Sequence, residues 1–448
     1  MVWILAMVDF NQIGPRLDIC RNMYLYPPVT GCPGLRTNYR PVLQTGGLAM
    51  RCESMHRRRF LQTTMAATTG TMLGGNMLLS AETSNRIKIE EPFHGAVLNH
   101  RHGEQGADTL KISVKGLAPG GSRVTVNGAP ARCDGGRFVT EVVLREKETD
   151  IAAVSEGDSG RQEDRVRVVW DRYSQPRYRF SIDDNSFFLR DVFQKKYKSL
   201  FDCFYLGILK DLNRKYGAKF VLNIYYTTGD DFSLPQFPDS YKGEWCDNSG
   251  WLKLAFHAHA NEPDRPYQDA PPEQLIADFD QVAEQIHRFA GEQTYSPPTV
   301  IHWGMLRNSA LKPLALRGVR VLSGSFGRNS RGVYDVNYRL DDARSEYLSH
   351  HDALKDFDSG IVFSKCDIVC NNVPVEKTVE TLEPVVADPN RAEIMDLFTH
   401  EQYFWPFYKR YIPEHGQRLD AAIRFVTEKG YKPVLFHEGF LGGRDWNV

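Results

Sequence analysis

Two adjacent carboxylates, Asp183 and Asp184, stand at the end of an aromatic and aliphatic run that begins at Tyr178. Such a run predicts a buried strand that delivers both carboxylates to its carboxyl end. Neighbouring carboxylates repel each other, so both ionise readily only beside a cation or where one of them handles protons. The alternative is an Asp-rich turn that serves only local hydrogen bonds. The pair therefore predicts a metal or acid–base site, with the turn as the competing interpretation.

Polar side chains follow most of the later strand-like runs in the same way. They are His257 and His259, His302, His400 with Glu401, and His437 with Glu438. In a parallel barrel, the carboxyl ends of all strands lie on one face. We therefore expect these side chains to converge with the two aspartates on one site.

The elements that would position these residues lie in the large domain predicted over 177–448, where helical and strand patterns alternate. The clearest helix is predicted over Pro272–Ala290, where apolar residues recur every three or four positions. Another helical pattern covers Asp191–Tyr216. The later strand-like runs are Phe220–Tyr226, Trp251–His259, Thr299–Gly304, Val319–Ser323, Gly360–Phe363, Ile394–His400 and Pro433–Glu438. Strands that alternate with helices indicate an α/β fold with a parallel sheet, and this many indicate a closed or nearly closed barrel.

A smaller domain is predicted over 87–171, where short runs alternate apolar with polar residues between turn formers. Period two with such turns is typical of an all-β sandwich. Asn127 and Gly128 predict a hairpin turn, because both tolerate positive φ. No row of exposed aromatic residues is evident, so we expect a spacer or packing domain instead of a binding domain.

The composition is that of an ordinary globular protein: 448 residues, a formal net charge of −1, 42% hydrophobic and 25% charged residues. No basic excess indicates nucleic-acid binding, and no apolar run predicts a membrane span in the mature chain. Beyond residue 81 the five cysteines form an odd set without a CxxC pair. This set is a poor disulfide framework for an exported protein, with one or two bridges as the alternative.

An export signal is predicted over residues 50–81. Arg57, Arg58 and Arg59 precede Phe60 and Leu61, and a segment of small and moderately apolar residues follows. This pattern resembles a twin-arginine signal peptide, which implies the twin-arginine export machinery as a partner and a periplasmic or extracellular location. Because such a signal must lie near the amino terminus, we expect residues 1–49 to be a non-native or disordered extension.

From residue 178 onward the chain resembles the polysaccharide deacetylase superfamily, which includes the nodulation-type deacetylases and carbohydrate esterase family four. The resemblance implies a distorted (β/α)7-8 barrel. In the family's first motif an apolar strand ends in two aspartates, the first a base and the second a metal ligand; Ile182, Asp183 and Asp184 match it. The smaller domain resembles the immunoglobulin-like modules of secreted bacterial carbohydrate enzymes, chiefly at Val124–Gly128 and Gly136–Phe138.

The family's second motif, two metal-binding histidines four residues apart, is matched only in part. His257 fits the first position, but Asn261 stands at the second. Residues two apart on a strand face the same side, so His259 could bind the ion together with His257. Asn261 could contribute an oxygen, although amide oxygen is a poorer ligand for zinc. The predicted metal ligands are therefore Asp184, His257 and either His259 or Asn261, with zinc as the expected ion.

Three further catalytic residues follow from the resemblance. Arg307 is the candidate for an arginine that orients the catalytic aspartate. His400 and His437 are both candidates for the histidine that protonates the leaving group, and His400 is preferred because a charged and aromatic cluster follows it. Candidate substrate-binding aromatics in the expected loops are Trp245, Tyr267, Trp303, Tyr403 and Trp405.

The resemblance implies an exported, metal-dependent hydrolase that removes acetyl groups from a polysaccharide or amino-sugar glycan. A glycoside hydrolase on a related barrel is the alternative enzyme, with Asp183 or Asp184 acting together with Glu401 or Glu438. A third possibility is a barrel without catalytic activity that binds polysaccharide.

Overall fold

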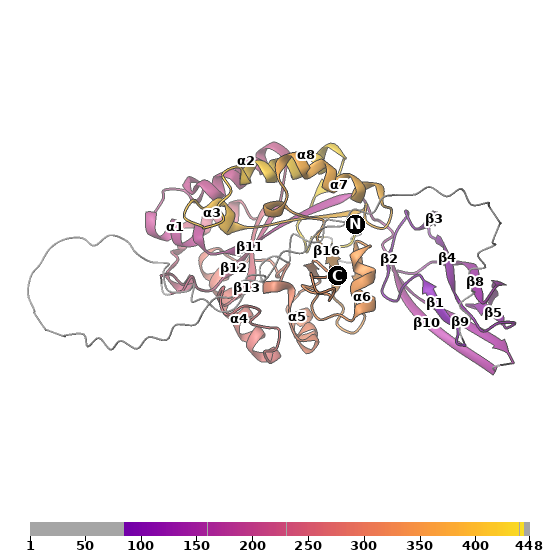
Figure 1. The fold of residues 1–448 in the computed structure, drawn as a ribbon. Helices are drawn as coiled ribbons and strands as arrows, with labels where there is room; N and C mark the ends of the chain where they lie inside the picture. The colour runs from indigo at the N-terminus through magenta and orange to yellow at the C-terminus, as the bar shows by residue number, and fades with distance from the viewer. Residues whose placement is uncertain (1–84, 159, 230, 439, 443–448) are drawn as a thin grey trace, which may run out of the picture. The chain divides into compact units, whose positions relative to one another are not determined.

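The structure is a computed structural model that describes residues 85–158, 160–229, 231–438 and 440–442. All of these residues belong to one compact unit. Figure 1 shows its β-rich part in indigo to magenta, and the α/β part in the colours that follow. The expected extension, 1–49, and the expected signal, 50–81, lie outside the described residues.

The β-rich part consists of two sheets that share one hydrophobic core. One sheet contains β1 (Lys88–Glu91), β3 (Gly103–Gln105), β4 (Leu110–Leu117), β7 (Arg132–Asp134) and β8 (Arg137–Leu144). The other contains β2 (Val97–Leu98), β5 (Arg123–Val126), β6 (Ala129–Pro130), β9 (Glu148–Gly157) and β10 (Gly160–Trp170). Alternate residues such as Ile112 and Val114 fill the core, because successive strand residues face opposite sides. The predicted hairpin turn is confirmed, with φ of 46° at Asn127 and 82° at Gly128.

The α/β part also contains two sheets. The larger has the order β13 (Leu252–Ala258), β12 (Phe220–Tyr225), β11 (Arg177–Asn185), β18 (Ile394–His400) and β17 (Ile368–Val369), all parallel, with β19 (Lys432–Pro433) also pairing with β11. The smaller has β14 (Val321–Gly324) parallel to β16 (Val362–Lys365), and β15 (Ala353–Lys355) antiparallel to β16. An α/β class is therefore correct.

The predicted closed barrel is not found among the described strands, because no strand pairing joins the two sheets and their backbones are linked by isolated hydrogen bonds. On one side, residues 294–299 bridge the gap: Leu254 N–H donates to Thr294 O at 2.9 Å, and Ser323 N–H donates to Thr299 O at 2.8 Å. The expected strand over Thr299–Gly304 is absent there, and residues 302–304 form a 3₁₀ turn instead. Two prolines at 297 and 298 explain the interruption, since proline has no N–H to donate to a sheet.

Helices connect the strands. They are α1 (Phe187–Lys195), α2 (Phe204–Tyr216), α3 (Lys242–Asp247), α4 (Pro272–Phe289), α5 (Leu311–Leu316), α6 (Asp342–Ser349), α7 (Thr378–Ala387) and α8 (His415–Glu428). The prediction for α4 is confirmed. The single helix predicted over Asp191–Tyr216 is wrong: Ser199 and Asp202 form a capping box at a 3₁₀ turn, so the chain ends α1 and starts α2 separately.

The amino ends of the strands in the α/β part surround a second core that the carboxyl-terminal segment fills. Leu435, Phe436 and Phe440 pack there with residues near the starts of several strands, such as Val221 and Ile394. The strand predicted over 433–438 is correspondingly short, since β19 ends at Pro433.

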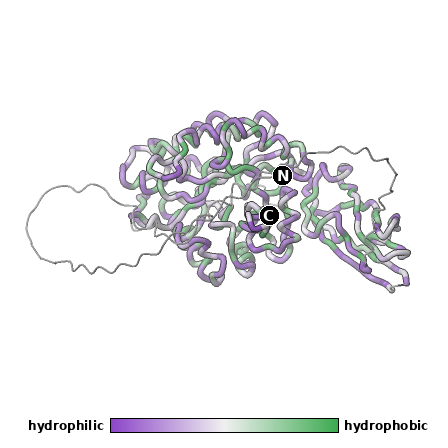
Figure 2. The backbone as a smooth tube through the Cα atoms, viewed as in Figure 1, coloured by the Kyte–Doolittle hydropathy of each residue, from purple (hydrophilic) through white to green (hydrophobic). Residues whose placement is uncertain are grey.

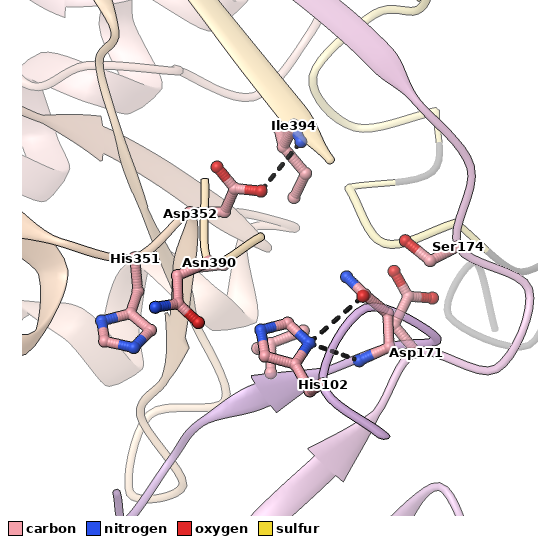
Figure 3. Close-up of a pocket in the computed structure, with 10 residues that line it drawn as sticks. His102, Asp171, Ser174, His351, Asp352, Asn390 and Ile394 are labelled. Carbon is pink, nitrogen blue, oxygen red and sulfur yellow. Dashed lines mark hydrogen bonds between the residues drawn. The ribbon is translucent and has the colours of Figure 1, made fainter. Parts of the chain in front are cut away.

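Side-chain contacts join the β-rich and α/β parts within the compact unit. Phe93 stacks on Tyr347 with ring centroids 4.8 Å apart, and Arg101 Nε donates to the buried Glu393 carboxylate at 2.5 Å. A cavity of about 10 Å³ lies close by, between His102 and the carboxylate of Asp352 (Figure 3). Such a cavity holds about one water molecule and is too small for a sugar.

Hydrophobic and hydrophilic residues alternate closely along the chain in both parts (Figure 2). Within the described ranges, no helix is both long and apolar enough to cross a membrane. Five cysteines of the described chain are free: Cys133, Cys203, Cys246, Cys366 and Cys370.

Candidate metal centre

The backbone at the end of β11 separates the two adjacent aspartates. Asp184 has a φ of 59°, and the pairing of β11 with β12 is irregular between Ile182 and Asn185. A left-handed conformation is uncommon for a residue other than glycine and often marks a functional position. Here the two side chains meet different partners: Asp183 Oδ1 accepts from Asn223, and Asp184 Oδ1 lies against His257.

Asp184, His257 and His302 bring one ligand atom each to a common point, all within 4.8 Å of one another. His257 Nε2 lies 3.1 Å from Asp184 Oδ1, and His302 Nδ1 lies 3.0 Å from His257 Nε2. His302 Nδ1 is 3.5 Å from Asp184 Oδ1. One carboxylate oxygen and two imidazole nitrogens form a donor set that suits zinc and related divalent ions.

The outer nitrogens of the two histidines are held by backbone carbonyls. His257 Nδ1 lies 3.1 Å from Val300 O, and His302 Nε2 lies 3.3 Å from Asn261 O. A carbonyl oxygen only accepts, so each outer nitrogen carries the hydrogen. In neutral imidazoles the inner nitrogens then present lone pairs to each other and to Asp184. Three acceptors that converge in this way repel one another unless a positive charge lies between them.

The shifted pKa values also indicate that one positive charge is favoured among Asp184, His257 and His302. Burial lowers the pKa of His257, but the charges of Asp183 and Asp184 outweigh burial and raise it. Burial and the neighbouring His257 lower the pKa of His302 to about 4. Burial raises the pKa of Asp184, but the hydrogen bond from His257 and the nearby His400 and His302 hold it well below its usual range. A cation bound among these residues would take the place of the proton on His257.

Two side chains orient the Asp184 carboxylate. The Tyr225 hydroxyl donates to Oδ1, and Gln402 Nε2 donates to Oδ2 at 2.7 Å. Tyr225 is buried on β12, and Gln402 is the second residue after the end of β18. Hydrogen bonds to a ligating carboxylate fix its direction and are part of most metal sites.

Asp183 is placed for proton transfer beside the cluster. Its Oδ1 accepts from Asn223 Nδ2 at 2.7 Å, and its Oδ2 lies 3.8 Å from His257 Nε2. Asn223 is itself fixed by Thr299, whose N–H donates to Asn223 Oδ1 at 3.2 Å. Burial raises the pKa of Asp183 to about 7, against the lowering effect of His257. A carboxylate with that pKa exchanges protons readily near neutral pH.

His400 lies near the same centre. It pairs in register with Asp183 across β11 and β18, and its Nδ1 is 3.0 Å from Asn371 Oδ1. Burial lowers its pKa, against the charge of Asp184.

His259 is not brought to the cluster. It stacks on Tyr226 with centroids 5.0 Å apart, and its Nδ1 lies 3.8 Å from Asp278 Oδ1. The expected common face with His257 is lost because the pairing of β12 and β13 shifts by one residue there and β13 ends at Ala258. His302 occupies the third position instead, and Asn261 supports it through its backbone carbonyl.

Arg307 and His437 also lie away from the aspartates. Arg307 is exposed and donates to Asp269 O, so it holds a loop and does not contact Asp183. His437 belongs to the segment that fills the amino-end core, beside Arg179 and Arg320, and burial lowers its pKa to about 3. Arg307 and His437 are both absent from the site for the same reason: neither residue follows a strand that ends there.

Of the five candidate substrate-binding aromatics, four are buried: Trp245, Tyr267, Tyr403 and Trp405. Trp405 donates its Nε1–H to Glu401, and Tyr267 donates to Asp278. Trp303 is half-buried next to His302, with a φ of 64° and the Arg265 guanidinium 4.9 Å above its ring. It alone of the five combines exposure with a place beside the cluster.

Sequence reasoning overlooked Asn223, Tyr225 and Gln402. Asn223 carries a usable signal, because a lone amide in the apolar run Phe220–Tyr225 needs a specific partner when the strand is buried. Gln402 gives no such signal, since its position depends on a turn after β18.

No family model matches the sequence, and no curated protein matches it. Among solved structures, the chain is similar to Agd3, described as a novel carbohydrate deacetylase, with 10% identity, a TM-score of 0.32, and coverage of 78% of this chain and 73% of that chain. A Bacteroides fragilis protein provisionally described as an alpha-galactosidase gives 11% identity, a TM-score of 0.28, and coverage of 77% and 79%. The titin domains z1z2 in complex with telethonin give 10% identity and a TM-score of 0.15, covering 23% of this chain and 60% of that chain, which is less than two thirds of its length. At these TM-scores we base no conclusion on the similarities.

Proposed function

We propose that the chain is a carbohydrate-active hydrolase that uses a divalent metal, with zinc as the expected ion, to remove acetyl groups from a polysaccharide or amino-sugar glycan. One observation carries the proposal: the lone pairs of His257 Nε2 and His302 Nδ1 converge with Asp184 Oδ1, and Asp183 lies beside them as a base. A convergent acceptor set with an adjacent base is the arrangement that metal-assisted hydrolysis requires.

Asp184, His257 and His302 would hold the ion. When bound, such an ion polarises the acyl carbonyl and lowers the pKa of water. Asp183 accepts a proton from the attacking water, while Asn223 keeps its Oδ1 in place. The water oxygen bonds to the acyl carbon, the C–N or C–O bond breaks, and acetate leaves.

His400 returns a proton to the departing amine or alcohol. Burial lowers the pKa of His400, so its protonated ring gives up a proton readily, and the proton that Asp183 takes from water restores it. Asn371 Oδ1 accepts a hydrogen bond from His400 Nδ1–H and so keeps the imidazole ring in one orientation. The net reaction adds one water and leaves acetate and an unblocked glycan.

The glycoside hydrolase alternative is not favoured by the geometry. The Glu401 carboxylate accepts three backbone N–H groups and the Trp405 Nε1–H, so its oxygens are occupied. Glu438 is exposed, lies near the amino ends of the strands and pairs with Lys219. Neither carboxylate is available to face Asp183 or Asp184 across a sugar ring.

We propose further that the α/β part is an open variant of the deacetylase barrel and that the β-rich part is an immunoglobulin-like spacer. The twin-arginine pattern at 57–61 supports export to the periplasm or beyond. Cell fractionation would test the export route. We expect the mature protein outside the cytoplasm, and we expect the protein to stay in the cytoplasm when Arg57, Arg58 and Arg59 are changed to lysine.

Metal content and acetate release test the function together. The purified protein is expected to hold about one divalent ion per chain, and to lose it in Asp184→Ala and His302→Ala but not in the matched control His259→Ala. Asp183→Asn should keep the ion and stop acetate release from an N-acetylglucosamine oligomer. Full activity in Asp184→Ala would refute the metal assignment, and absence of any bound ion would favour a polysaccharide-binding role without catalysis.

A further inference from the structure

Gln402 has a fixed amide orientation beside the metal cluster. Its Nε2 donates to Asp184 Oδ2 at 2.7 Å. A carboxylate bound in this cluster only accepts, so the nitrogen of the amide must face Asp184 and the oxygen must face away. The orientation of Gln402 is therefore set by chemistry and does not depend on an arbitrary choice between two similar atoms.

The carbonyl oxygen of that amide has no partner. Gln402 Oε1 is a buried atom and accepts no hydrogen bond from any residue that the structure describes. An unsatisfied buried acceptor costs about 1–3 kcal/mol, so such atoms are rare unless a ligand or water supplies the donor. From covalent dimensions, Oε1 lies within about 5 Å of Asp184 Oδ2, which places it at the reaction centre.

We infer that Gln402 Oε1 accepts the N–H of the scissile amide, and that Gln402 thereby selects N-acetyl groups over O-acetyl esters. This inference rests on the proposed function and names its substrate class. The amide nitrogen is bonded directly to the reacting carbon. A pose that brings this carbon to Asp183 and Asp184 can therefore also present its N–H to Gln402 Oε1.

An ester offers the opposite chemistry at the same place. Its bridging oxygen carries only lone pairs, so it would face Gln402 Oε1 as acceptor against acceptor. A site built to accept a hydrogen bond discriminates against the analogue that lacks the donor, because its own polar group is then left unpaired. Gln402 is in this sense a specificity-determining residue, while Asp183 and the metal cluster serve both substrates.

The test uses two matched tetrasaccharides: the β-1,4-linked tetramer of N-acetylglucosamine, and cellotetraose acetylated at each 2-hydroxyl. They differ in N–H against O at the scissile position. Esters are intrinsically more reactive than amides, so rates on the two substrates are not compared directly. For each protein, kcat/KM for the amide is divided by kcat/KM for the ester, and this amide-to-ester ratio is compared between the wild type and Gln402→Met. We expect that ratio to fall about 10–100-fold in the variant, which is the effect of one lost hydrogen bond in a buried site.

Tyr225→Phe is the matched control. It removes the hydrogen bond from the Tyr225 hydroxyl to Asp184 but leaves Gln402 Oε1 unchanged. Any loss of activity in this variant should affect both tetrasaccharides equally, so the ratio stays within about twofold of the wild type. A collapse of the ratio in Tyr225→Phe as well would assign the preference to the Asp184 carboxylate and overturn the role of Gln402.

Binding to the wild-type protein provides a readout that does not depend on catalysis or on folding of the variant. After EDTA treatment, calorimetry is expected to show the N-acetyl tetramer binding about tenfold more tightly than its ester counterpart. Equal affinities, together with an unchanged kcat/KM ratio in Gln402→Met, would overturn the inference and leave deacetylation standing. If neither tetrasaccharide binds or is hydrolysed, the proposed function and the inference both fail.

Discussion

Replacing Glu401 with alanine is expected to destabilise the fold strongly, because its carboxylate satisfies the start of α1. Oε2 accepts from the backbone N–H groups of Ser186 and Phe187 at 2.6 and 2.9 Å. Oε1 accepts from Phe188 N–H at 2.6 Å and from Trp405 Nε1–H at 3.0 Å. The N-cap residue, Ser186, makes no side-chain hydrogen bond to the helix. Glu401 therefore takes the place of the helix cap from the turn that follows β18.

The expected loss of unfolding free energy is about 4 kcal/mol, from four buried donors at about 1 kcal/mol each. We use the low end of the range for an unsatisfied donor because water can enter the space that the side chain leaves. Loss of a negative charge at a helix amino terminus adds about 0.3–1 kcal/mol.

Urea unfolding followed by circular dichroism and tryptophan fluorescence measures the change. Glu401→Gln keeps the shape and one acceptor oxygen, so its loss should be smaller than that of Glu401→Ala. Glu414→Ala is the matched control: Glu414 pairs with Arg418 four residues later and its side chain is partly exposed, so its loss should be much smaller than that of Glu401→Ala. If Glu401→Ala unfolds within about 1 kcal/mol of the wild type but loses activity, Glu401 acts in catalysis and the reasoning is refuted.

Two further substitutions test the site and the core. Asn223→Leu removes the hydrogen bond to Asp183 and should lower kcat about 10–100-fold with KM and metal content unchanged, in steady-state assays of acetate release; an unchanged kcat would show that Asp183 needs no such support. His437 has a folded pKa of about 3 against about 6.5 unfolded, so the unfolded chain binds its proton first and stability falls as pH drops from 6.5 to 3. His437→Phe should therefore be more stable than the wild type by about 3 kcal/mol at pH 4, and the gain should vanish above pH 7 in urea titrations. A gain that is the same at both pH values would exclude this cause.

The sequence predicts those features that depend on local pattern. β18 occupies the predicted run Ile394–His400, and α4 covers nearly all of the predicted helix. Both signals arise from the spacing of apolar residues, which reports the buried face of an element directly. The convergence of Asp184 with His257 was predictable for a related reason, since parallel strands place their carboxyl ends at one edge.

Features that depend on irregular backbone could not be predicted. The one-residue shift between β12 and β13 turns His259 away from His257, and nothing in the sequence marks that shift. The choice of His302 depends on a 3₁₀ turn with a left-handed Trp303, a conformation that no residue pattern specifies. The role of Glu401 depends on contacts with a helix more than 200 residues earlier in the chain.

The position of Asn261 suggests that a histidine placed there could serve as a metal ligand. Its Oδ1 lies 3.2 Å from the Tyr225 hydroxyl, which also contacts Asp184, so the side chain at 261 already points toward the cluster. A histidine there could supply the nitrogen that His302 provides. We expect His302→Ala to weaken zinc binding at least about tenfold, and Asn261→His in the same chain to recover part of that affinity.

Competition with a chromophoric chelator measures these affinities, and the single variant Asn261→His serves as the control for damage to the loop. Tyr225→Phe combined with the rescue pair should leave the recovered affinity largely intact, since the new imidazole would bind the ion directly. If the double variant His302→Ala, Asn261→His binds zinc no better than His302→Ala, position 261 does not face the ion. The third ligand position would then belong to the turn that carries His302 and not to the loop that carries Asn261.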